Sequence, residues 1–450
     1  GGAQGGSLAS IVGTGSGTLT KAGSGSWTLT GASTYTGANT VSAGSLVAGR
    51  AGNAFGATTA AMVVNGGTLD LGAFDQATGA VTFSSGGLTG TAGILTATAL
   101  NVTATTAVAL DALLGGAGTL SLNGVGGTLT IARANTTFNG TTTLTNGTLA
   151  FGVDDALPGA ITVNGGTLAL GTFSKTGGAI TFAGGTITQT SGTFSPTSLT
   201  ATNTSGTLNL DVTLSDAGSL TMNGAGGTLS VNGTNTGFAG TTTVTAGTLK
   251  GSTADAFGTS AITVNGGTFD LNALTLANNV TINTGGTLSG GTFAVSQLTA
   301  TGGTVSASLT GAGTLTKTGA GTLTLSAAND FTGGTTINGG TLTFANAVDH
   351  LADAGTVTVN TGGTLALGAS NVLADTNAIV VNGGTFSLGT FSDTVGAVTL
   401  TSGNITGSSG VLTGTGYTVS DGTVSAVLAG GAGVNLAKTT SGTVVLSGTN

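Results

Sequence analysis

A long internal repeat constrains the fold of this chain more than any other feature. Residues 313–342 have the sequence GTLTKTGAGTLTLSAANDFTGGTTINGGTL, and related segments occupy residues 17–46, 118–149 and 218–249, with a shorter copy from residue 433. Matched leucines lie 101, 100, 95 and 121 residues apart, at Leu19, Leu120, Leu220, Leu315 and Leu436. These spacings indicate a super-repeat of about a hundred residues. We expect one continuous solenoid over residues 1–450, with super-repeats at about 15–114, 115–215, 216–309 and 310–428 and a truncated fifth at 429–450.

The longest of these intervals contains an extra copy of a second motif. It holds both TVNTGGTLALG at residues 358–368 and VVNGGTFSLG at residues 380–389, whereas the other intervals hold one copy each, at residues 63–72, 162–171 and 263–272. The matched Asn360 and Asn382 are 22 residues apart. An insertion of this length predicts one additional coil of a solenoid.

Within each repeat, apolar and polar residues alternate. In the segment GTLTL at residues 321–325 the leucines fall on one face and the threonines on the other, which is the pattern of a half-buried strand. Such strands end at Gly-Gly, Asn-Gly or Ala-Gly, which supply the positive φ angles of tight corners. Short strands, glycine corners and a period of about 20 residues predict an all-β fold, a right-handed parallel β-helix. An array of β-hairpins is the alternative, and the recurrence of similar strands at coil-like spacing disfavours it.

Composition agrees with a buried β core and excludes several classes of protein. The chain has 87 Gly, 2 Pro and no Cys, with 38% hydrophobic and 5% charged residues and a net charge of −8. Disulfides and thiolate metal sites are excluded, as is collagen, which needs abundant proline and a strict glycine period. Seven Lys and Arg residues are too few for a nucleic-acid partner. No apolar run approaches the roughly 18–20 residues that span a bilayer, so we expect no membrane insertion in this segment.

One aromatic side chain recurs at a matched place in the repeat. It is Tyr35, Phe138, Phe238 and Phe331 in successive copies, each followed by Gly two residues later. We expect these rings to fill the core of the coil. A ligand-binding platform is the alternative, although sugar-binding rings are more often Trp or Tyr.

Residues able to carry out catalysis are sparse. The single histidine, His350, lies near Asp349 and Asp353, which could orient it as in a catalytic triad, but we expect a solvent-exposed corner. Asp154 and Asp155 form the one pair of adjacent carboxylates, and we expect a solvated corner there rather than a cation site. We predict no catalytic, cofactor-binding or metal-binding residues and no enzyme.

Other short motifs are attributed to chance in a chain rich in Thr, Gly and Asn. Lys317-Thr318-Gly319 and Lys175-Thr176-Gly177 match the K-T-G element of β-lactamase-like enzymes without its partner motifs. The glycines of residues 13–17 precede no helix and no Gly-Lys pair, so they predict no phosphate loop. Asn-x-Thr triplets, as at Asn101 and Asn146, indicate nothing firm about glycosylation.

The segment at residues 313–342 resembles the passenger-associated transport repeat of bacterial autotransporters. Its lysine, paired T-L-T-L, aromatic residue and final G-T-L occur in order, whereas the copies at residues 118–149 and 218–249 have Leu122 and Met222 in place of the lysine. The resemblance implies an extracellular β-helical passenger or stalk of a Gram-negative, type V-like secreted protein. Such proteins carry an N-terminal signal and a C-terminal membrane β-barrel, so we expect this chain to be part of a longer protein.

Three functions follow as hypotheses. The first is a non-enzymatic structural or adhesive stalk, extracellular on the bacterial cell surface, whose partners are host or neighbouring cells. The second is a segment of a self-assembling filament or sheath, in which uncharged faces associate laterally or end to end. The third is ice binding by threonine ladders such as residues 141–143 and 241–243. The ladders drift in sequence, which disfavours this third hypothesis.

Overall fold

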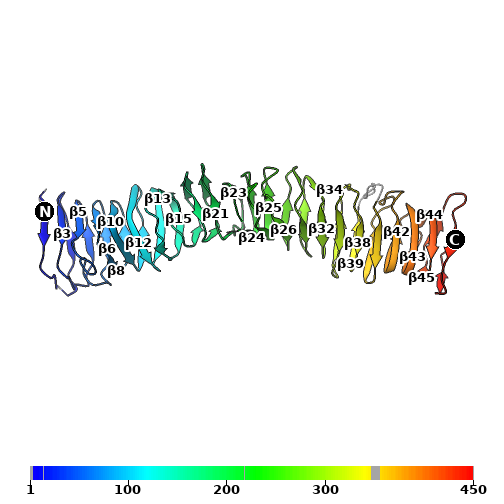
Figure 1. Ribbon diagram of the computed structural model, residues 1–450, viewed down its shortest axis with the longest axis horizontal. Coiled ribbons are helices and arrows are strands. Elements are labelled where there is room, and N and C mark those ends of the chain that lie inside the picture. The colour runs from blue at the N-terminus through cyan, green and yellow to red at the C-terminus, as the bar shows by residue number, and fades with distance from the viewer. Residues whose placement is uncertain (1–3, 14, 217, 346–354, 449–450) are drawn as a thin grey trace. The chain divides into compact units, whose positions relative to one another are not determined.

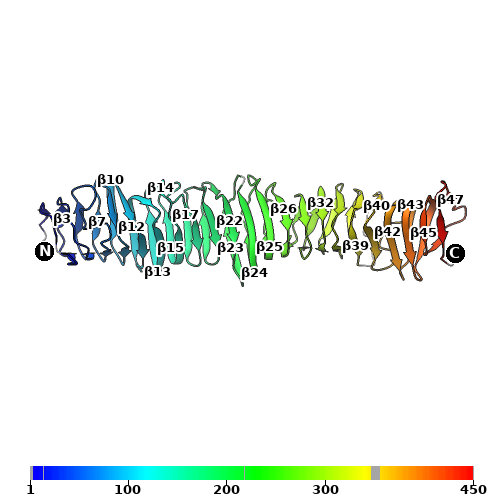
Figure 2. The same ribbon diagram turned by 90° about the horizontal axis from the view of Figure 1, so that it is seen from below.

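The structure is a computed structural model that describes residues 4–13, 15–216, 218–345 and 355–448. The described residues contain strands and no α-helix. They divide into two compact units, one of residues 1–203 and 207–219 and the other of residues 204–206 and 220–450. Within each unit the strand pairs are parallel, and successive coils stack side by side (Figures 1 and 2). The predicted parallel β-solenoid is therefore confirmed, and the hairpin array is excluded. The super-repeat boundaries stay a prediction.

In the first unit, short strands of successive coils align into three faces. The first face contains β2 (Leu19–Lys21), β4 (Asn39–Val41), β6 (Met62–Val64), β9 (Val81–Phe83), β11 (Ala99–Val102), β16 (Ile161–Val163), β19 (Ala179–Phe182) and β22 (Ser198–Ala201). The second contains β1 (Gly6–Leu8), β3 (Ser26–Leu29), β5 (Ser45–Ala48), β7 (Thr68–Asp70), β17 (Thr167–Gly171), β20 (Thr186–Gln189) and β23 (Thr207–Asp211). The third contains β8 (Gln76–Thr78), β14 (Thr137–Phe138), β18 (Lys175–Thr176) and β21 (Phe194–Ser195). Longer strands bend from one face to the next, and they are β10 (Gly87–Ala97), β12 (Ala107–Gly116), β13 (Thr119–Ile131) and β15 (Thr142–Phe151).

The second unit repeats this arrangement. Its first face contains β26 (Ala261–Val264), β29 (Val280–Ile282), β32 (Gln297–Ala300), β35 (Thr314–Lys317), β38 (Thr335–Ile337), β40 (Val357–Asn360) and β47 (Leu436–Lys438). The second contains β27 (Thr268–Asp270), β30 (Thr287–Ser289), β33 (Gly303–Val305), β36 (Thr322–Leu325), β39 (Gly340–Phe344), β41 (Gly363–Leu367), β45 (Gly422–Val424) and β48 (Val444–Leu446). The third contains β28 (Thr275–Leu276), β31 (Thr292–Ala294), β34 (Ser308–Gly311), β37 (Asp330–Phe331) and β46 (Val427–Ala429). The bent strands are β24 (Ser219–Val231), β25 (Thr241–Gly251), β42 (Ile379–Gly389), β43 (Asp393–Gly407) and β44 (Val411–Val419).

The alternation of the sequence sets which side chains enter the core. In β36, Leu323 and Leu325 are buried, whereas Thr322 is exposed and Thr324 half-buried. The recurring aromatic side chains are also in the core, because Tyr35, Phe138, Phe238 and Phe331 are each at most 2% exposed. The predicted core role of these rings is confirmed.

Coil length varies around the predicted period. Phe293 pairs with Leu309, 16 residues later, and Leu46 pairs with Leu69, 23 residues later. The extra motif forms a coil of its own, because Asn360 of β40 pairs with Asn382 of β42. Corner residues absorb this variation in length. No helix of the described residues is long and apolar enough to cross a membrane.

Candidate functional site

The lysine of the repeat motif is a buried corner residue. Lys21 and Lys317 are at most 1% exposed, although each is the charged member of a short strand. The Lys317 Nζ donates to the carbonyl oxygens of Thr318 at 2.7 Å, Gly319 at 3.0 Å and Gly339 of the next coil at 2.9 Å. The Lys317 ammonium therefore ties its own corner to the corner of the following coil.

Lys21 forms the same arrangement in the first unit. Its Nζ donates to Gly23 O at 2.7 Å and, in the next coil, to Ala43 O at 2.9 Å. The glycine after each of these acceptors, Gly44 or Gly340, has a φ near +60° and lies directly over the ammonium. A Cβ on Gly340 would stand 2.7 Å from Lys317 Nζ, so the lysine and the glycine form one unit of packing.

A third lysine is buried at a different corner. Lys175 donates to the carbonyl oxygens of Gly177, Thr176 at 3.3 Å and Pro158 at 3.5 Å, and it is fully buried. Burial lowers the pKa of Lys175 to about 8, and the nearby Asp155 carboxylate opposes this shift. Burial also lowers the pKa of Lys317. The two K-T-G segments, predicted to carry no catalytic role, are thus corners that bind backbone carbonyls.

Threonines on the first face of the second unit form an uninterrupted column. Thr243, Thr263, Thr281, Thr299, Thr316, Thr336 and Thr358 pair in register, one from each successive coil. We call these seven residues the threonine column, and each is half-buried and faces outward. Asparagine side chains run beside it, with hydrogen bonds from Asn360 to Asn338 at 2.8 Å and from Asn382 to Asn360 at 3.2 Å. The surface is uncharged, polar and periodic at the spacing of strands, roughly 4.8 Å.

The carboxylates that the sequence singled out have structural partners. Asp154 Oδ1 accepts the N–H of Ser174 at 2.7 Å, and Asp155 accepts both the N–H and the hydroxyl of Thr176, at 2.6 and 2.7 Å. Both therefore tie their turn to the next coil. Asp349, His350 and Asp353 lie outside the described residues. Among the residues that the structure describes, no group of three or more His, Cys, Asp or Glu side chains could hold a metal ion.

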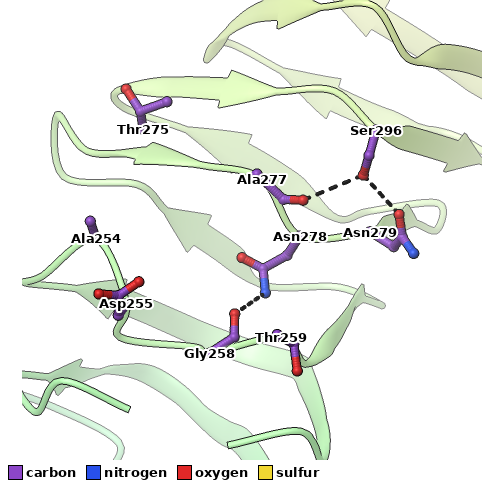
Figure 3. Close-up of a pocket in the computed structure, with 9 residues that line it drawn as sticks. All are labelled: Ala254, Asp255, Gly258, Thr259, Thr275, Ala277, Asn278, Asn279 and Ser296. Atoms are coloured by element: carbon purple, nitrogen blue, oxygen red, sulfur yellow. Dashed lines mark hydrogen bonds between the residues drawn. The ribbon is translucent and has the colours of Figure 1, made fainter. Parts of the chain in front are cut away.

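A polar pocket of about 540 Å³ lies beside β28 in the second unit (Figure 3). Its polar side chains come from one turn and the next two coils, and they are Asp255, Thr259, Thr275, Asn278, Asn279 and Ser296. Asn278 donates from Nδ2 to Gly258 O and Ser260 O, both at 3.0 Å, and Figure 3 shows its side-chain oxygen facing the hollow. Ser296 donates to Asn279 Oδ1 at 2.9 Å.

Sequence reasoning missed the buried lysines and the pocket. The lysines carried a usable signal, because strict alternation in T-L-T-K places Lys317 on the same face as Leu315. The pocket carried only a weak signal, because residues 271–276 (LNALTL) differ from the matched segments LGAFDQ at 71–76 and LGTFSK at 170–175.

Comparison with known proteins agrees with this geometry. The family model described as the passenger-associated transport repeat matches residues 19–48, 220–250 and 315–344, which include Lys21, Met222 and Lys317. A stretch of 61 residues is 54% identical to a protein named adhesin BmaC autotransporter from Brucella suis biovar 1 (strain 1330). That match covers 14% of this chain and 2% of the adhesin. No solved structure matches the chain. The chain carries autotransporter passenger repeats, as the sequence resemblance predicted.

Proposed function

We propose that this chain, which carries the passenger-associated transport repeats of autotransporter passenger domains on a parallel β-solenoid, is a non-enzymatic structural and adhesive segment of a bacterial surface protein. The observation that carries the proposal is the threonine column in register on an uncharged sheet face. Such a face offers hydroxyl and amide groups to another surface without the charge repulsion that keeps most β proteins apart.

Adhesion of coated beads tests this proposal. Beads carrying residues 1–450 are expected to bind cultured epithelial cells or bacterial cells more than uncoated beads. A variant with Thr263→Lys, Thr299→Lys and Thr336→Lys places three cations on the column, in alternate coils, and is expected to bind less. A control with lysine at the exposed positions Thr91, Thr190 and Ser409 carries the same charge elsewhere. Equal binding by coated and uncoated beads would reject the adhesive function.

A second candidate function is a subunit of an extracellular filament or sheath. The same threonine column supports it, because two copies can bury matching uncharged faces against each other. Electron microscopy of the purified chain tests this function. Ordered assemblies would support it, and single particles at every concentration would contradict it.

A further inference from the structure

Four coils share a position at which one buried side chain faces the preceding turn. Each follows a strand of the second motif, in the hexapeptides LGAFDQ (71–76), LGTFSK (170–175), LNALTL (271–276) and LGTFSD (388–393). Their last residues are Gln76, Lys175, Leu276 and Asp393, and all are at most 2% exposed. Three are polar and one is apolar, so the chain supplies its own internal comparison.

The three polar residues bind the turn before them. Gln76 accepts the N–H of Ala54 at 3.1 Å, and Asp393 accepts the N–H of Val372 at 2.9 Å. Lys175 donates to Pro158 O. Leu276 has no polar atom in its side chain and makes no such bond.

Among the described residues, a matched backbone hydrogen bond also ties three of these turns to the next coil, and the turn before Leu276 lacks it. The backbone N–H of Gly52 donates to Asp75 O at 2.8 Å. The N–H of Asp155 donates to Ser174 O at 2.9 Å, and that of Asn371 to Ser392 O at 3.0 Å. The turn of residues 253–260 instead closes on itself, with N–H groups of residues 256, 258 and 260 bonded to carbonyls of residues 253, 255 and 257. The pocket of about 540 Å³ opens beside this turn and β28, an edge strand of its four-stranded sheet, and the Asn278 side chain joins the turn to that coil.

Comparison with Asp155 shows which hydrogen-bond donors the Asp255 carboxylate lacks. Asp155 and Asp255 occupy the same place in their turns, each followed by a buried pair, Ala156-Leu157 or Ala256-Phe257. Asp155 accepts the hydroxyl and the N–H of Thr176, whereas Ala277 replaces that threonine beside Asp255. The Asp255 carboxylate is exposed and accepts no hydrogen bond from the described residues.

A second acceptor faces the same hollow. Asn278 is 9% exposed and donates both of its hydrogen bonds from Nδ2, and its side-chain oxygen accepts none from the described residues. Thr259 and Thr275 add hydroxyls that both donate and accept, and Ala254 and Ala277 add small apolar surfaces (Figure 3). One carboxylate and one amide oxygen are too few for Ca²⁺, which takes six to eight oxygen ligands.

We propose that this pocket binds a saccharide unit through Asp255 and Asn278. Vicinal hydroxyls of a sugar donate to the two acceptors and exchange hydrogen bonds with the threonine hydroxyls, while its C–H faces cover the alanine methyls. The bound hydroxyl takes the place that the Thr176 hydroxyl holds at Asp155. This inference rests on the proposed adhesive function and gives it a ligand class.

Saturation-transfer NMR on residues 1–450 tests the proposal. The probes are methyl α-mannopyranoside, methyl β-galactopyranoside and N-acetylglucosamine, with 1,5-diaminopentane as the alternative cationic ligand. Wild type is expected to show transfer to at least one sugar, and Asp255→Asn to weaken that binding roughly tenfold or more, because a hydrogen bond to a charged group is lost. Asp330→Asn, an exposed aspartate on the same sheet in β37, is the matched control and is expected to bind like wild type.

A variant that supplies an internal partner for Asp255 provides an independent test. Leu276→Lys with Ala277→Thr copies residues 175–176, and it is expected to give Asp255 the hydroxyl partner that Asp155 has and to abolish transfer. If this variant does not fold, as judged by circular dichroism, Asp255→Asn decides alone, since its side chain is exposed. Absence of transfer to every sugar, transfer that persists in the folded double variant, or binding of the diamine in place of sugars would each overturn the proposal. Bead adhesion that persists in Asp255→Asn while sugar transfer is lost would reject the pocket as the adhesive contact and leave the adhesive function standing.

Discussion

Buried lysines are the residues at which the core of this chain, which has few charges, differs most from an ordinary core. An ammonium taken out of water loses hydration, and backbone carbonyls only partly replace it. At Lys317 three carbonyl oxygens lie within 3.0 Å of Nζ. Among the described residues, the ion pair of the chain joins Arg133 to Asp111, away from these corners. The lysines therefore act as hydrogen-bond donors to the corners rather than as members of salt bridges.

The lowered pKa of Lys175 predicts stability that rises with pH. Between pH 8 and the ordinary lysine pKa of 10.5, the unfolded chain holds a proton that folded Lys175 has released, so raising the pH favours the folded state. Below pH 8 the cost of burying the charge is fully present, on the order of 3 kcal/mol. The urea midpoint of the wild type is expected to rise from pH 7.5 to pH 9.5, and to rise less in Lys175→Met.

Lys438→Met is the control for this measurement, because Lys438 is exposed. The range stops below pH 10 because burial raises the pKa of Tyr35 to about 12, and the unfolded tyrosine ionises first above pH 10. If the urea midpoints of Lys175→Met and wild type changed equally with pH, deprotonation of Lys175 would not contribute to the pH dependence of stability.

Replacing Lys317 separates the volume of the side chain from its hydrogen bonds. Lys317→Ala leaves a cavity and three carbonyls without their donor, with an expected loss of about 2–5 kcal/mol. Lys317→Met keeps most of the volume, and Met222 is buried at the matched place in another copy, so its expected cost is below about 2 kcal/mol. Urea denaturation followed by circular dichroism measures both variants. Equal losses would assign the stabilisation to the hydrogen bonds alone.

At the residue scale, the sequence predicted inward and outward positions well and the chemistry of corners poorly. Alternation placed Leu323 inside and Thr322 outside, as the structure confirms. The same rule applied to Lys317 predicts that its side chain is buried. The general tendency of lysine to be exposed argues against that prediction, so the burial was not expected. The acceptors that make burial tolerable, such as Gly339 O, belong to the next coil and are visible only once the register is known.

Single coils are the elements that the sequence predicted most directly. The spacing of Asn360 and Asn382 matches their pairing in the structure. Turns were less predictable, because the bond to the preceding turn depends on one side chain. Lys175 donates to Pro158 O of that turn, whereas Leu276 at the matched place has no polar atom. Alternation is a property of one strand, whereas a pocket depends on several coils together.

Removal of a whole coil is expected to be tolerated. Deleting residues 360–381 joins Val359 to Asn382, which continues the strand as the same motif, TVNGG. Core residues then keep their faces. Circular dichroism and resistance to proteolysis are expected to match the wild type.

Removal of half a coil is the matched comparison. Deleting residues 360–369 removes β41 and leaves half a coil, so the core side chains of β39 and β42 lose the strand that lies between them. We expect loss of protease resistance and aggregation of this variant. Equal damage by the two deletions would contradict the coil as the unit of folding.

At the scale of the whole molecule, the shortage of charge is the property that most affects association. The chain has 7 Lys and Arg and 15 acidic residues in 450, where a typical soluble domain carries about 25% charged residues. Long polar faces without charge lack the lysines that usually prevent sheets from associating. The free energy that one threonine pair contributes to association of two copies is small, but the contributions of successive coils add along the threonine column.

Self-association through the threonine column is therefore expected in solution. In sedimentation velocity the weight-average sedimentation coefficient of the wild type is expected to rise with concentration, and to change little with salt because charges contribute little to the contact. The variant with lysines at Thr263, Thr299 and Thr336 is expected to remain monomeric, since association would bring like charges together and bury them. The control with lysines at Thr91, Thr190 and Ser409 is expected to associate like the wild type. A wild type that stays monomeric at the highest concentration would leave the column as a surface for other partners, and association of all three proteins alike would place the contact elsewhere on the molecule.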